Sequence, residues 1–216
     1  DSRSVLCQLL KTFLDKAEIV IMPINEILAV KSKQDIVNNT KLKLAINCAP
    51  ILKGSKAAHI ITVSLQEFNI IKELLKDTGI SCYLLRGKYD SFNLYLYRRD
   101  MIETYLARED VTDFLKIYGY ETGNFPQMLV RLSERSKEFC NNANEFPHEI
   151  GVFLEYPLGD VKGFIENKGK NSLYAGYWKV YRNRTATRRL FERFDEEREQ
   201  VVRQILDGAS IREVMV

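Results

Sequence analysis

The sequence predicts a single α+β domain, with a mixed sheet of about four strands that includes one hairpin and is flanked by many helices. Apolar residues recur at helical spacing in 64–78 and 185–207, whereas they alternate with polar ones in 92–97. No internal repeat or linker-like tract separates these elements. The chain has 216 residues, 45% of them apolar and 28% charged, which is ordinary globular usage and excludes intrinsic disorder.

The clearest helix signal follows a short apolar run. Residues 59–63 have the composition of a buried strand, and Ser64 with Glu67 three residues later forms a capping-box pattern. Gly79 supplies the residue type that ends a helix. We therefore expect a strand followed by a helix over 64–78.

The hairpin is predicted from two β-rich runs, 80–86 and 92–98, which only five residues connect. So short a connection cannot form a parallel crossover, so the pair must be antiparallel. We further expect the strands 59–63 and 80–86 to form a right-handed parallel unit around the intervening helix. Residues 173–181 are the predicted fourth strand.

Helices account for the remainder of the predicted domain. Residues 1–35 are expected to form an N-terminal helical extension, and 185–216 a C-terminal helix. Residues 146–168 predict two short helices joined near Tyr156-Pro157. No apolar run approaches the roughly 20 residues of a membrane span, and no signal peptide is recognisable, so we expect no membrane partner.

The charge and cysteine content restrict the class of protein. The formal charge is +3, with nine basic and five acidic residues in 1–60 but 14 basic and 17 acidic in 61–178. So small an excess does not imply a polyanionic partner. The four cysteines lie far apart without a C-x-x-C pair, which favours a reducing cytoplasmic location.

Several chemical motifs are missing. Neither a P-loop nor a G-x-G-x-x-G fingerprint occurs, so no nucleotide cofactor is predicted, and no other cofactor is identified. The two histidines, His59 and His148, belong to no metal-binding spacing, so we expect no metal site. Cys48 lies among turn-type residues, with Lys53 and Lys56 nearby, and is either an activated nucleophile or a small buried apolar residue.

The spacing of apolar residues in 150–165 matches a helix-turn-helix. Residues 145–170, however, contain five acidic residues and three lysines, and two of the acids, Asp160 and Glu166, lie on the would-be recognition helix. A helix in the major groove must cross two phosphate strands, so this charge argues against a nucleic-acid partner.

Three motifs carry a family resemblance: Cys48-Ala49-Pro50, Phe146-Pro147-His148-Glu149-Ile150-Gly151 and Gly176-Tyr177-Trp178-Lys179-Val180-Tyr181. Together they resemble a family of uncharacterised bacterial proteins, mostly from anaerobes, over a core of residues 40–195. The chain departs from the family pattern at Ser55 and Ala57. The resemblance implies a domain of unknown function and no particular reaction.

The predicted site combines these motifs. Pro147 suits the first turn of a helix, which places His148 and Glu149 near a helix N-terminus. The candidate catalytic residues are Cys48, His148 and Glu149. The candidate ligand-binding residues are Lys56, Trp178, Lys179 and Tyr181. We expect a cytoplasmic protein that binds or acts on a small molecule; the alternatives are a helix-turn-helix nucleic-acid-binding module and a structural interaction protein.

Overall fold

The computed structural model describes residues 35–88, 90–142 and 146–215. The predicted N-terminal extension lies almost wholly outside the described residues. The chain packs as two compact units, and we name their described parts the sheet unit (35–101 with 192–215) and the hairpin unit (102–191). Two compact units can belong to one domain, so the single-domain organisation stays a prediction.

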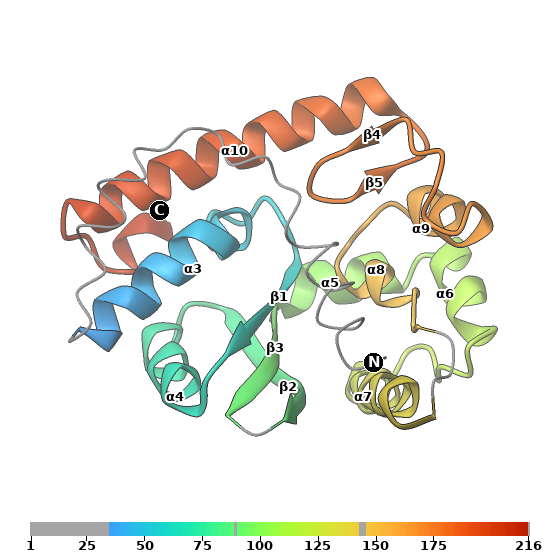
Figure 1. The fold of residues 1–216 in the computed structure, drawn as a ribbon, viewed down its shortest axis with the longest axis horizontal. Coiled ribbons are helices and arrows are strands. Elements are labelled where there is room, and N and C mark those ends of the chain that lie inside the picture. Colours follow the sequence, from blue (N-terminus) through green and yellow to red (C-terminus); the bar gives the residue numbers. More distant parts are fainter. Residues whose placement is uncertain (1–34, 89, 143–145, 216) are drawn as a thin grey trace. The chain divides into compact units, whose positions relative to one another are not determined.

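The sheet unit contains three strands, the helices beside them and the C-terminal part of a long helix (Figure 1). In chain order its elements are α3 (Ile36–Leu52), β1 (Ala58–Val63), α4 (Leu65–Leu74), β2 (Ile80–Lys88), β3 (Ser91–Arg98), the end of α10 (Arg184–Leu206) and a 3-10 turn, η1 (Glu213–Met215). α3 lies beside the C-terminal half of α10, and both contribute to one apolar core with the sheet.

The strand order in this sheet is β1-β3-β2, and both pairings are antiparallel. The predicted hairpin is confirmed, since Ile80 pairs with Arg98 and Lys88 with Ser91. β1 and β2 are both antiparallel to β3, so they run parallel to each other as expected, but β3 lies between them and they are not hydrogen-bonded neighbours. The hairpin places β3 beside β2, and the other edge of β3 pairs with β1.

Local capping follows the sequence closely. Ser64 Oγ accepts a hydrogen bond from the Glu67 N–H, and the Glu67 carboxylate accepts one from the Ser64 N–H, so the capping box is complete. At the end of α3, Arg98 donates to the carbonyl oxygens of Ile51 and Leu52 at 2.8 and 2.9 Å. A cation at a helix C-terminus stabilises the last carbonyls, and here it also ties β3 to α3.

The hairpin unit is built from helices and one small two-stranded sheet. Its elements are most of α5 (Arg99–Leu106), α6 (Glu109–Lys116), α7 (Phe125–Asn142), α8 (Ile150–Phe153), α9 (Leu158–Glu166), β4 (Tyr174–Ala175), β5 (Lys179–Val180) and the beginning of α10. The predicted pair of short helices with a break at Tyr156-Pro157 is confirmed as α8 and α9. Within the described residues, no helix has the length and apolar character needed to cross a bilayer.

The predicted α+β class is confirmed, but the single four-stranded mixed sheet is not. Residues 173–181 form the separate β4–β5 hairpin instead of a fourth strand of the main sheet. The chain turns after Gly176, where a Cβ atom would lie 2.4 Å from Phe191 Cδ2. Trp178 then bonds to a carboxylate on α9. These contacts fold residues 173–181 back on themselves. The alternation of polar and apolar residues does not predict such a turn.

Candidate functional site

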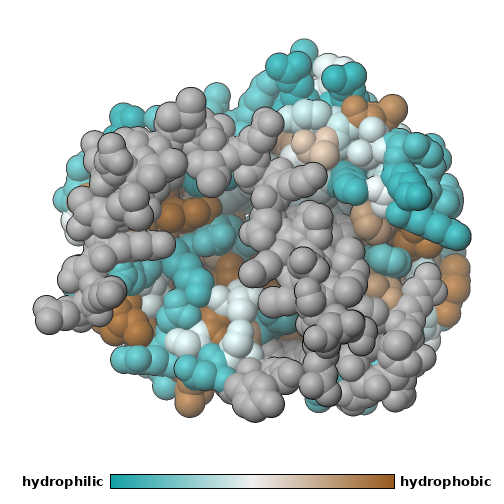
Figure 2. All heavy atoms as spheres, in the orientation of Figure 1, coloured by the Kyte–Doolittle hydropathy of each residue, from teal (hydrophilic) through white to brown (hydrophobic). Residues whose placement is uncertain are grey.

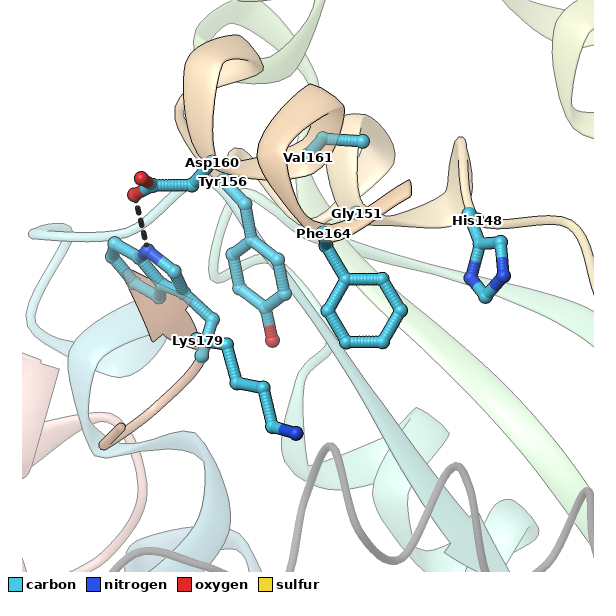
Figure 3. Close-up of a pocket in the computed structure, with 8 residues that line it drawn as sticks. His148, Gly151, Tyr156, Asp160, Val161, Phe164 and Lys179 are labelled. Carbon is cyan, nitrogen blue, oxygen red and sulfur yellow. Dashed lines mark hydrogen bonds between the residues drawn. The ribbon is translucent and has the colours of Figure 1, made fainter. Parts of the chain in front are cut away.

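A small pocket lies in the hairpin unit where the turn before α8, helix α9 and strand β5 meet (Figure 3). Its lining residues are His148, Gly151, Tyr156, Asp160, Val161, Phe164, Trp178 and Lys179. Three of them, His148, Trp178 and Lys179, were predicted from the sequence as site residues. The enclosed cavity is only about 10 Å³, close to what a single water needs, and it opens to the surface.

Asp160 organises one wall of the pocket from the first turn of α9. Its side chain is 2% exposed, and both carboxylate oxygens are bonded. Oδ2 accepts from the indole N–H of Trp178 at 2.9 Å, and Oδ1 accepts from the backbone N–H groups of Tyr181 and Arg182 at 2.8 and 2.9 Å. Three donors compensate a buried carboxylate, so this acid holds the hairpin on α9.

Aromatic rings form most of the remaining wall. Trp178 stacks on Tyr156 with centroids 4.8 Å apart and meets Phe191 edge-on at 4.5 Å. The His148 ring lies 5.2 Å from the Phe164 ring and 5.0 Å from the Phe146 ring. Burial raises the pKa of Tyr156, so its phenol stays protonated at neutral pH.

Lys179 supplies the positive charge beside these rings. Its ammonium donates to the Gly169 carbonyl oxygen at 2.6 Å and lies 5.8 Å from the centroid of the Phe164 ring. Figure 3 shows the Lys179 side chain, the Tyr156 hydroxyl and the Phe164 ring directed into the same space. An ammonium has three N–H donors, and the Gly169 contact uses one of them.

Glu149 follows His148 directly but points elsewhere. Its side chain is fully buried, forms an ion pair with Arg135 from α7, and accepts a hydrogen bond from Tyr120 Oη at 3.1 Å. Burial raises the pKa of Tyr120, and the Glu149 charge raises it further, which keeps that phenol a donor. Glu149 makes no capping bond on α8, so its position favours a structural role over the catalytic one predicted.

Small residues make this packing feasible. A Cβ atom at Gly163 would lie 2.6 Å from Tyr181 Cβ, and one at Gly151 would lie 3.0 Å from Val161 Cγ2. The distance at Gly163 leaves no room for a methyl group, and a methyl group at Gly151 would require Val161 to shift. Tyr181, a predicted ligand-binding residue, therefore packs on α9 beside the pocket without lining it.

Cys48 and Lys56 belong to the sheet unit. Burial raises the Cys48 thiol pKa to about 12, against the opposing effect of Lys56 and Lys43. A thiol that stays protonated is a weak nucleophile, so the chemistry of this side chain does not support the predicted catalytic role. Lys56 is 5% exposed and lies two residues before β1.

Sequence reasoning missed Tyr156, Asp160 and Phe164 as pocket residues. The sequence indicates Asp160 only as a charge that repels phosphate. A further signal is present, because Asp160 shares a helix face with the uncharged Gly163 and Phe164, three and four residues further on. An acid in such a place is usually bonded inside the protein.

The described residues contain no group of three or more His, Cys, Asp or Glu side chains placed to hold a metal ion. No curated protein and no solved structure matches the chain. A family described as "Protein of unknown function (DUF3793)" matches residues 44–215. This match extends through the α8–α9 and hairpin motifs that build the pocket, and it shows that the chain belongs to the DUF3793 family.

Proposed function

We propose that the hairpin unit binds a small organic anion in the pocket between α9 and β5. The observation that carries this proposal is the charge of the pocket. Its acid, Asp160, is compensated by three N–H donors, while the Lys179 ammonium retains donors for a ligand.

The pocket walls indicate what the rest of the ligand resembles. Trp178, Tyr156, Phe164 and His148 present rings around the cavity. Such walls suit an apolar or flat ligand body with one polar end for orientation. The enclosed space admits a group about the size of one water, such as a carboxylate or phosphate oxygen. The ligand body then lies in the open mouth, with side-chain rotations of the kind that binding commonly produces.

Reaction chemistry is not part of this proposal. The Cys48 thiol is buried and protonated, and Glu149 is bonded to Arg135 and Tyr120. Neither side chain lines the pocket. We therefore assign binding to this site, with His148, Trp178 and Lys179 as the contacts.

Native mass spectrometry tests the proposal. The full chain would be purified gently, and then also incubated with benzoate, phenyl phosphate and acetate as probes. We expect the wild type to retain a small anion that is released on unfolding, and the Lys179→Met variant to lose it because the ammonium is gone. Lys116→Met is the matched control, since Lys116 is an exposed lysine of α6 outside the pocket.

The proposal would be overturned if wild type and Lys179→Met held the same anion to the same extent. It would also be overturned if none of the three probes bound to the wild type at millimolar concentration. Thermal melting of both variants would establish that each is folded before binding is compared.

A further inference from the structure

We propose that the exposed basic side chains around the β4–β5 hairpin bind the backbone of single-stranded nucleic acid. We name this set the basic surface: Lys162, Lys168, Lys170, Arg182, Arg184 and Arg189. It excludes the pocket lysine, Lys179, so it stands independently of the small-anion site.

The exposed side chains of this region carry a more positive net charge than its whole sequence does, because most of its acidic residues are not exposed. Between residues 146 and 191, seven of the eight basic side chains are exposed, but of the four acidic ones only Glu166 is. Glu149 and Asp160 are buried and bonded inside the unit. The acidity that argues against a phosphate partner in the linear sequence is therefore mostly internal. The exposed charges of residues 146–191 are therefore mostly positive.

Contacts place several of these side chains around α9. A Cβ atom at Gly159 would lie 2.7 Å from Arg182 Cδ, so Arg182 lies across the beginning of this helix. Lys162 follows Gly159 by three residues and shares its side of the helix. Lys168 and Lys170 come just after the C-terminal end of α9, a helix about 13 Å long in all.

The remaining members, Arg184 and Arg189, lie in the first turns of α10, which has no acidic residue in its first turn. Figure 2 shows hydrophilic side chains over the beginning of α10 and over α9, at the upper right. The positive charges thus lie on α9, on the first turns of α10 and in the segments that flank the hairpin. An extended polyanion can contact several of them at once, which is how phosphate backbones are held.

The exposed groups between the cations favour a nucleic acid over a membrane. In residues 146–191, Leu173 is the only large aliphatic side chain that is exposed, whereas membrane-surface helices present an apolar stripe. Tyr174 and Tyr177 of the hairpin are half-buried, and their rings lie 5.8 and 5.3 Å from Phe191. Partly exposed rings among Lys and Arg are typical of single-strand binding, where bases stack on them.

Packing argues against reading of a duplex groove by α9. The hairpin covers one side of this helix through Asp160 and Gly163, and Glu166 is among its exposed residues. A recognition helix needs a free face with cations to enter the major groove. The expected mode is therefore backbone binding without sequence preference.

Fluorescence anisotropy with labelled oligo(U) and oligo(dT) of about 20 nucleotides tests this inference at several salt concentrations. The test variant combines Lys168→Gln, Lys170→Gln, Arg184→Gln and Arg189→Gln. We expect it to bind at least about tenfold more weakly than wild type. The slope of log K against log salt should become shallower by up to about 3, because about 0.7 counterions are released per phosphate contact in single strands.

The control variant removes the same charge elsewhere, through Lys72→Gln, Lys76→Gln, Lys116→Gln and Lys137→Gln, all of them exposed residues. It should retain most of the affinity. Equal losses in both variants, or no salt-dependent binding by wild type, would overturn the inference. So would a preference for duplex DNA or for phosphatidylserine vesicles over the single strands.

Discussion

In the sheet unit, aliphatic side chains from α3, α4, β1, β3 and α10 fill the core, whereas in the hairpin unit two buried carboxylates hold separate segments together. Aliphatic cores tolerate changes that conserve volume, because contacts between methyl groups have no fixed direction. A buried carboxylate needs its own set of donors at fixed places. Substitutions should therefore be more costly per atom in the hairpin unit, where the candidate site lies.

The largest expected difference concerns Asp160. Asp160→Ala should lower the free energy of unfolding by about 3 kcal/mol or more, because it leaves three buried N–H donors without an acceptor. Leu94→Met, a core change of similar volume in the sheet unit, should cost under about 1.5 kcal/mol. Urea unfolding of both variants measures this contrast. A cost for Asp160→Ala no larger than for Leu94→Met would refute the organising role of the carboxylate.

Glu149 should show the next largest effect. Glu149→Gln removes the charge that faces Arg135 and should cost about 2 kcal/mol. The double variant Glu149→Gln, Arg135→Met should recover part of that loss, because no unpaired charge then remains buried. Chemical denaturation of the two single variants and the double variant gives the coupling energy. Strictly additive costs would show that the two side chains do not act as a pair.

The close contact of Gly176 with Phe191 predicts a smaller effect on stability. Gly176→Ala should destabilise the protein by about 1–2 kcal/mol, since its methyl group would overlap Phe191. The neighbouring exposed residue provides the control, and Ala175→Ser should stay within about 0.5 kcal/mol of wild type. Thermal melting compares the two. A Gly176→Ala variant as stable as wild type would mean that the hairpin adjusts easily.

The smallest effect is the loss of stability in the sheet unit over a single unit of pH, from 6 to 5. Burial lowers the His59 pKa to about 3, and the nearby Lys56 charge lowers it further. Because the unfolded chain takes up this proton near pH 6.5 and the folded one does not, stability is full above that pH and falls as the pH drops toward 3. The loss from pH 6 to pH 5 should be at most about 1.4 kcal/mol. His59→Gln should flatten the profile, and an unchanged slope would contradict this cause.

Local signals in the sequence predicted much of the fold. The Ser64 capping box, the antiparallel pair over 80–98 and the long C-terminal helix depend on neighbouring residues, and the structure contains all three. The strand order and the hairpin conformation of residues 173–181 depend on contacts between residues that are distant in sequence, such as Gly176 with Phe191. The spacing of apolar residues does not predict these contacts, because it reports local structure and the contacts join separate segments of the chain.

The candidate site was predicted in part for the same reason. His148, Trp178 and Lys179 stood in unusual motifs, and the structure brings them to one pocket. Glu149 and Asp160 carried charges whose role depended on burial, which a charge count does not include. The hydrogen-bond donors around a carboxylate therefore show whether it has a structural role or is available to a ligand.

Trp178 provides the most direct test of the small-anion site, because it is the only tryptophan in the chain and it lines the pocket. Its fluorescence can be followed while phenyl phosphate or benzoate is titrated into the 216-residue chain. We expect a saturable change in emission that is lost in Lys179→Met and kept in Lys116→Met. No saturable change in the wild type, or an identical titration in Lys179→Met, would contradict it.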